Sequence, residues 1–127
     1  MIQNQHTGAE ANNFGKRMAE IVKEKIGAVR VNPNGNEFLW NGKRITIRSA
    51  HRNNTYVGVL RNMLDRIDTI LATLEFKVRG EFQVWELDME TYKKHSKPQV
   101  RNPQIEQVRT KVFTEHGVLI DKVRDIK

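Results

Sequence analysis

The sequence predicts an α/β domain in which helices flank a small mixed β-sheet. Apolar residues recur at helical spacing over residues 8–26, an Asn-Gly pair joins two alternating segments at 37–48, and a nearly continuous apolar segment follows at 69–74. The expected order is a helix, three strands, a short helix, two strands and then helical material. The 127 residues have the length of a single domain, 1–127.

The first helix is expected from Gly8 to Ile26, after a disordered lead-in at residues 1–6. Thr7 and Glu10 have the spacing of a capping box, in which Thr7 is the N-cap. Gly27 can adopt the left-handed conformation that ends many helices. The apolar face of this helix carries Phe14, Met18, Ile21, Val22 and Ile26.

A β-hairpin is expected at 37–48, because Asn41-Gly42 is the preferred two-residue hairpin loop. A two-residue loop fixes the register, so that Glu37 lies opposite Thr46. The inward face then consists of Phe38, Trp40, Ile45 and Ile47, and the other face of Glu37, Arg44, Thr46 and Arg48.

The other elements follow from local patterns. The strand at 43–48 and the strand at 69–74 are separated by enough residues for a helical crossover, so they are expected to lie parallel. Residues 96–127 are expected to form a basic helical extension. In chain order we expect a strand at 28–31, a turn at 32–35, a polar loop at 49–56, a helix at 60–67, strands at 69–74 and 82–87, a helix at 90–95, a loop at 96–103, a helix from 102 to 112, and a strand or helix at 118–123.

Composition restricts the function classes. The absence of cysteine excludes disulfides, cysteine-ligated zinc and thiol catalysis. No apolar run approaches the roughly 20 residues that cross a bilayer, and no secretory signal is visible, so we expect a cytoplasmic protein without a membrane partner. With 22 Lys+Arg against 15 Asp+Glu, the net charge of +7 favours a polyanion, and nucleic acid first.

The outward face of the hairpin is the first candidate site. Glu37, Thr46 and Arg48 converge there by register, since facing Cβ atoms lie about 5 Å apart. An acid, a hydroxyl and a guanidinium on one face can hold a phosphate or a metal-bound water. The alternative is an ordinary cross-strand ion pair on a solvated face.

The succession of elements over about residues 8–88 resembles the PD-(D/E)XK nuclease superfamily, which has the restriction-endonuclease-like fold. The resemblance is carried by Glu20 in the first helix and by the segments 36–48, 65–71 and 82–87. It implies an αβββαβ core. It also implies that Glu37 occupies the place of the first acid, Thr46 that of the second acid, Arg48 that of the lysine, and Glu20 that of the helix acid of some members.

Two of these implied catalytic positions depart from the family pattern. Magnesium prefers hard oxygen ligands, and Thr46 supplies no charged one. Arg48 is permanently protonated and cannot act as a base. The resemblance therefore implies a nuclease-like protein with a degenerate active site, for which cleavage is not expected. The alternative is an active DNA endonuclease in which Glu37 holds Mg²⁺ or Mn²⁺ and Arg48 stabilises the transition state.

Cations concentrate in two segments. Residues 43–61 contain five basic residues and no acid, and residues 92–111 contain six basic residues and one acid. We expect these segments to bracket a nucleic acid, duplex DNA first, rather than to form only a solvated surface. The expected contacts come from Lys43, Arg44, His51, Arg52, Asn53, Arg61, Lys93, Lys94, Lys97 and Arg101.

Two further partners are expected on weaker grounds. Related folds pair to grip two strands, so a homodimer is an expectation by analogy. The basic charge also fits a protein-interaction module, either a subunit of a restriction or defence complex or an inhibitor that meets an acidic protein surface.

Overall fold

The computed structural model describes residues 2–33 and 35–126, with side chains for 13–33 and 35–126. Its elements are α1 (Ile2–Ile26), β1 (Val29–Arg30), β2 (Glu37–Trp40), β3 (Lys43–Ala50), β4 (Tyr56–Leu60), the 3₁₀ turn η1 (Arg61–Met63), β5 (Thr69–Glu75), β6 (Glu81–Asp88), α2 (Met89–His95), β7 (Lys97–Pro98), β8 (Ile105–Arg109), α3 (Thr110–His116) and β9 (Val118–Arg124).

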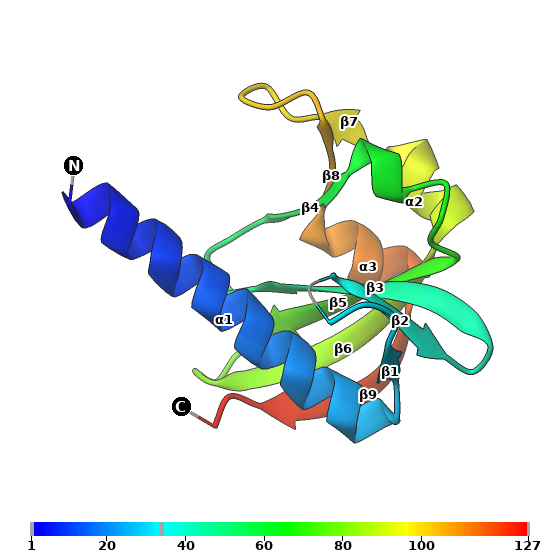
Figure 1. The fold of residues 1–127 in the computed structure, drawn as a ribbon, viewed down its shortest axis with the longest axis horizontal. Helices are drawn as coiled ribbons and strands as arrows, with labels where there is room; N and C mark the ends of the chain where they lie inside the picture. The colour runs from blue at the N-terminus through cyan, green and yellow to red at the C-terminus, as the bar shows by residue number, and fades with distance from the viewer. Residues whose placement is uncertain (1, 34, 127) are drawn as a thin grey trace.

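Two sheets organise the described chain. The large sheet has six strands in the order β1-β2-β3-β5-β6-β9, and the small sheet has three in the order β4-β8-β7. Helix α1 lies along one face of the large sheet, and the small sheet, α2 and α3 cover the other face (Figure 1). The predicted mixed α/β class is confirmed.

Helix α1 begins at Ile2, so the chain is already helical at Thr7, where we predicted the N-cap. The side chains of the predicted lead-in and capping box lie outside the described residues. The C-terminal end is as predicted, because Gly27 adopts a φ of 77° and the next N–H, of Ala28, donates to the carbonyl of Lys23 at 2.9 Å.

The hairpin of β2 and β3 has the predicted loop and register. Asn41 and Gly42 have φ values of 51° and 76°, the left-handed conformations that a type I′ turn requires. Glu37 pairs with Thr46, and β1 continues the antiparallel meander beside β2. The turn predicted at 32–35 includes residue 34, which lies outside the described part of the chain.

Strand β3 runs parallel to β5, as predicted, but the crossover between them differs from the expectation. The helix predicted at 60–67 is wrong, because the chain forms β4 and then the single turn η1. The helix predicted at 102–112 is also wrong, since β8 pairs antiparallel with β4 and sets Val57 opposite Val108. Short apolar patterns fit either a strand or a helix, and this distant pairing decides between them.

The C-terminal region is not the helical extension that we expected for 96–127. It forms β7, β8, α3 and β9, and β9 adds an edge strand to the large sheet beside β6. The polar loop predicted at 49–56 is shorter than expected, because β3 continues to Ala50 and β4 begins at Tyr56.

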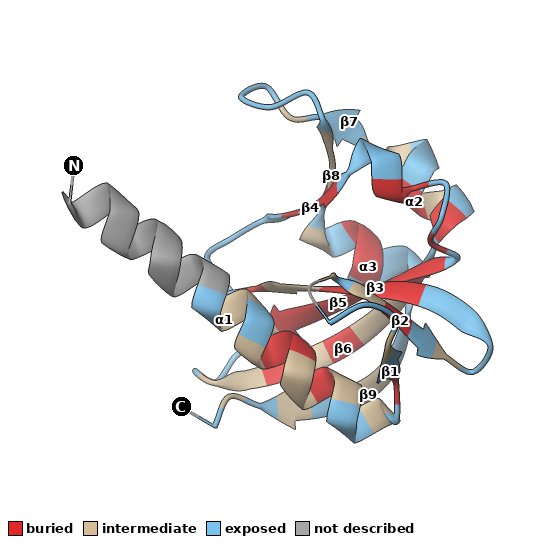
Figure 2. Cartoon of the chain, in the orientation of Figure 1, coloured by how far each residue is buried: buried red, intermediate tan, exposed pale blue. Residues whose placement is uncertain are grey.

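Buried side chains form one cluster on each face of the large sheet. Val22, Phe38 and Ile45 belong to the cluster under α1, and Ile70, Tyr92 and Phe113 to the cluster under the small sheet (Figure 2). Trp40 and Trp85 pack partly buried against these clusters. Among the described residues, no helix has the length and apolar character needed to cross a membrane.

Candidate functional site

The carboxylate of Glu37 on β2 is held between two arginines. Its Oε1 accepts hydrogen bonds from Nε and Nη2 of Arg66 at 2.8 and 2.6 Å, and its Oε2 accepts one from Nη1 of Arg44 at 3.1 Å. The side chain is only 13% exposed. Sequence reasoning missed Arg66, which reaches Glu37 from 29 residues further along the chain. The two guanidiniums neutralise the negative charge of the Glu37 carboxylate and occupy both of its oxygens, so the carboxylate is a poor ligand for a metal ion.

Thr46 and Arg48 on β3 lie under the small sheet. Thr46 is fully buried, and neither its Oγ1 nor the Nε of Arg48 has a hydrogen-bond partner among the described residues. Nη2 of Arg48 lies 3.9 Å from the Sδ of Met63. Burial lowers the pKa of Arg48, while the neighbouring Tyr92 opposes this shift. Even so, an arginine remains protonated and provides no base.

Tyr92 was also missed by the sequence reasoning. Its hydroxyl donates to the backbone carbonyl of Glu106 at 2.6 Å, which ties α2 to β8. Burial raises the pKa of Tyr92 far above its ordinary value, so the phenol stays neutral. This side chain helps to seal the interior that contains Arg48.

Glu37, Thr46 and Arg48 share one face of the large sheet, as the register predicted, but they do not form an open site. Glu37 contacts Arg44 and Arg66, whereas Arg48 extends toward Met63. The expectation that this whole face meets phosphates is wrong for Thr46 and Arg48, because β4, β8 and α2 pack over that part of β3.

Glu20 does not join these residues, because α1 packs on the opposite face of the sheet. Its carboxylate contacts Nη2 of Arg30 at 2.5 Å and Nζ of Lys23 at 2.9 Å. Hydrogen bonds from Lys23 and Arg30 hold the pKa of Glu20 below its ordinary value. Over the side chains described, no three His, Asp or Glu residues gather to hold a metal ion. The metal position inferred at Glu37 thus has no acidic cluster around it.

The cations of the segment 43–61 do not form one surface. Strand β3 separates Lys43 and Arg44 from the loop at 51–55, and its eight residues span about 26 Å. Most of these cations already have partners in the fold. Lys43 pairs with Glu86 at 2.9 Å, Arg61 pairs with Glu106 at 2.7 Å, and Arg52 donates to the carbonyl of Lys77 at 3.0 Å.

The loop at 51–55 places His51 against α1. The ring of His51 stacks on that of Phe14 with 4.0 Å between centroids, and its Nδ1 lies 3.1 Å from Oε1 of Glu75. Asn53 is exposed in the same loop. His51 therefore contacts both the helix and the sheet, but its side chain is still 52% exposed, so His51 and Asn53 are both open to solvent.

The second basic segment contributes exposed cations around the β7–β8 hairpin. Lys93 pairs with Asp65 at 3.2 Å, but Lys94, Lys97 and Arg101 are exposed and form no ion pair with any side chain that the structure describes. The hairpin projects from the body of the domain (Figure 1). At its turn Val100 is 96% exposed.

Backbone hydrogen bonds hold this hairpin in shape. The N–H of Gln99 donates to the carbonyl of Ile105 at 2.8 Å, and the N–H of Ile105 donates to that of Asn102 at 3.0 Å. At its base, Oγ of Ser96 donates to Oε1 of Glu106 at 3.1 Å. These hydrogen bonds thus fix the turn that carries Val100 and Arg101, and the strand β7 that carries Lys97.

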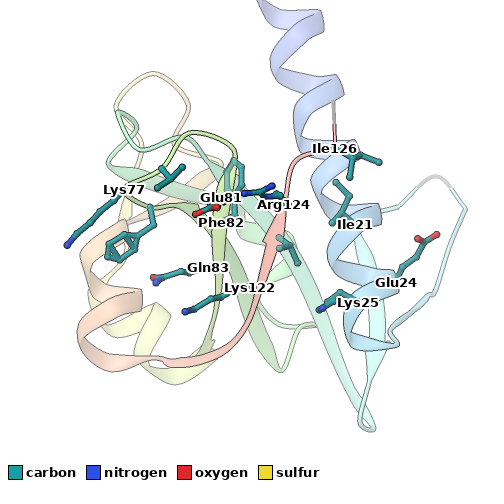
Figure 3. A pocket seen from close by; sticks show the side chains of 13 residues that line it. Ile21, Glu24, Lys25, Lys77, Glu81, Phe82, Gln83, Lys122, Arg124 and Ile126 are labelled. Atoms are coloured by element: carbon teal, nitrogen blue, oxygen red, sulfur yellow. Dashed lines mark hydrogen bonds and ion pairs between the residues drawn. The ribbon is translucent and has the colours of Figure 1, made fainter.

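A second candidate site, absent from the sequence predictions, is an open groove of about 950 Å³ beside β9. It lies between α1, the turn from β5 to β6, and the C-terminal residues (Figure 3). Its lining combines apolar side chains with a mostly basic rim: Ile21, Glu24, Lys25, Phe76, Lys77, Val78, Glu81, Phe82, Gln83, Lys122, Val123, Arg124 and Ile126.

Neither a protein-family model nor a curated protein matches this chain.

Proposed function

We propose that this chain is a nucleic-acid-binding domain with a nuclease-like fold that holds duplex DNA without cleaving it. The β7–β8 hairpin and the adjacent end of α2 form the contact surface. Lys94, Lys97 and Arg101 neutralise phosphates, and the polar residues of the hairpin turn face the groove between the strands.

The observation that carries this proposal is a set of exposed cations on the projecting hairpin and the adjacent end of α2 that form no ion pair with a described side chain. Most other cations predicted to bind DNA already have acidic partners, but Lys94, Lys97 and Arg101 have none among the described side chains. Val100 adds an exposed apolar tip between them, and apolar side chains on such elements can enter a groove and contact base steps.

The residues at the implied catalytic positions support the proposal that the chain binds DNA without cleaving it. Glu37 is neutralised by Arg44 and Arg66, and Arg48 lies largely buried beside Met63. Metal-dependent hydrolysis requires an open position at a bound ion, where water and phosphate meet. Glu37, Thr46 and Arg48 offer no such arrangement.

The nuclease kinship remains part of the proposal. It is supported by helix α1, the β1-β2-β3 meander and the parallel pairing of β3 with β5, which follow the succession that the resemblance implies. The crossover from β3 to β5 departs from it, since β4 and η1 stand where the αβββαβ core has a helix.

The test is a salt titration of DNA affinity with a matched pair of double variants. Binding of a labelled 20-base-pair duplex should fall steeply between low and physiological salt. K97A/R101A should reduce the slope of log affinity against log salt by about two, one unit for each lost phosphate contact. K25A/K122A removes the same charge from the groove beside β9 and should leave that slope unchanged.

Two outcomes would contradict the proposal. Affinity that is the same at both salt concentrations would exclude phosphate contacts as the source of binding. Equal losses in K97A/R101A and K25A/K122A would attribute binding to net charge rather than to the hairpin.

A further inference from the structure

The groove beside β9 has an apolar floor that the fold leaves uncovered. Phe82 is buried at its base, and Ile21 and Val123 line it from α1 and β9. At its open side, Phe76 is 43% exposed and Val78 is 54% exposed. Contiguous exposed apolar surface with a polar rim is typical of interaction sites.

The rim of the groove carries an excess of positive charge. Arg124 pairs with Glu81 at 2.7 Å. Lys25, Lys77 and Lys122 form no ion pair with a described side chain, and Glu24 is the remaining carboxylate of the lining. Three cations thus face one anion, which attracts a negatively charged occupant.

The cations lie on both sides of the strand that borders the groove. Lys25 comes from α1 and lies on one side of β9, whereas the side chains of Lys122 and Gln83 lie on the opposite side of that strand (Figure 3). Strand β9 is the edge strand of the large sheet, and its residues Lys122, Val123 and Arg124 line the groove. An occupant that meets all three lysines must therefore be long enough to cross this edge.

We propose that the groove binds an extended segment of a partner protein in which apolar and acidic residues alternate. The apolar side chains of the segment cover Phe76, Val78 and Val123, and its carboxylates pair with Lys25, Lys77 and Lys122. This site is independent of the β7–β8 hairpin, so it gives the chain a protein-binding function beside the proposed binding of DNA.

Charge and polarity select this occupant over two others. A nucleic acid would place hydrated phosphates over the apolar floor, which they cannot cover favourably. A second copy of the chain docked groove to groove would bring its own Lys25, Lys77 and Lys122 against those of the first, and like charges across an interface are costly. An acidic segment with apolar side chains can cover the apolar floor and also pair with the lysines of the rim.

The test uses fluorescence anisotropy with a labelled ten-residue peptide of alternating valine and glutamate. The control peptide has lysine in place of glutamate. At physiological ionic strength the acidic peptide should bind saturably and the basic peptide should not. K25A/K122A should weaken binding of the acidic peptide about fivefold or more. Phe76→Ser should also weaken it, because an apolar contact at the open side of the groove is lost.

A matched variant separates the groove from net charge. K94A/R101A also removes two cations, but from the region of the β7–β8 hairpin, and it should change the affinity for the acidic peptide less than twofold. Failure of the acidic peptide to saturate the protein would overturn the proposal, as would equal weakening by K25A/K122A and K94A/R101A. Because DNA affinity is measured separately, either function can fail without the other.

Discussion

Exchange of Arg48 for methionine is expected to stabilise the fold. The guanidinium lies mostly buried, its Nε has no partner among the described residues, and its Nη2 meets the Sδ of Met63, a weak acceptor. Burial lowers the pKa of Arg48, which means that the cation is less favourable there than in water. Replacement of buried ionic groups by apolar ones of similar shape is neutral or stabilising by about 1–4 kcal/mol. Because Arg48 keeps some exposure, we expect a gain of about 1–2 kcal/mol.

Urea denaturation followed by circular dichroism measures this gain, and the melting temperature should rise by about 3–8 °C. Arg44→Met is the control, because it removes a surface partner of Glu37 and should cost no more than about 1 kcal/mol. If R48M instead loses more than about 1 kcal/mol while its native spectrum is kept, the guanidinium has a favourable partner in solution, such as a bound anion. The view of Arg48 as an unsatisfied buried cation would then be wrong.

Three other outcomes are expected. Thr46→Val should stabilise the protein by about 1 kcal/mol in the same urea assay, because it removes a buried hydroxyl without a partner; a loss of stability would reveal a hydrogen bond to Oγ1. Asp88→Ala should cost about 1 kcal/mol at pH 7, since Asp88 caps α2 through the N–H and hydroxyl of Thr91. Those hydrogen bonds lower the pKa of Asp88, so the difference in unfolding free energy between the wild type and Asp88→Ala should be complete above about pH 4 and shrink as the pH falls through the lowered pKa. A stability difference that persists at about pH 2 would show that it does not come from the ionised carboxylate. Supercoiled plasmid should stay intact with Mg²⁺ or Mn²⁺, and nicking that disappears in both Glu37→Ala and Arg48→Ala would instead establish the endonuclease alternative.

Local chemistry made some elements predictable. The Asn41-Gly42 loop specifies a type I′ turn by itself, and that turn fixes the pairing of Glu37 with Thr46. Gly27 ends α1 for a similarly local reason, since it adopts a left-handed conformation without steric cost. The parallel pairing of β3 with β5 followed from the number of residues between the two strands, which is large enough for the crossover that parallel strands need.

The candidate site was predictable only in part. The register brought Glu37, Thr46 and Arg48 to one face, but the sequence did not indicate what would cover that face. The contact of Arg66 with Glu37 joins residues far apart in the chain. The groove beside β9 is composite in the same way, because α1, the β5–β6 turn and β9 each contribute part of its lining.

By itself the amino-acid sequence determined the charge of the protein, the hairpin with its register, and the end of the first helix, because each depends on residue type or on a few neighbouring residues. The tertiary structure decided whether the segments 56–60 and 105–109 would be strands, and which cations would remain unpaired. Both outcomes depend on contacts between residues distant in the chain, and a short apolar or basic segment has no local feature that selects its partner.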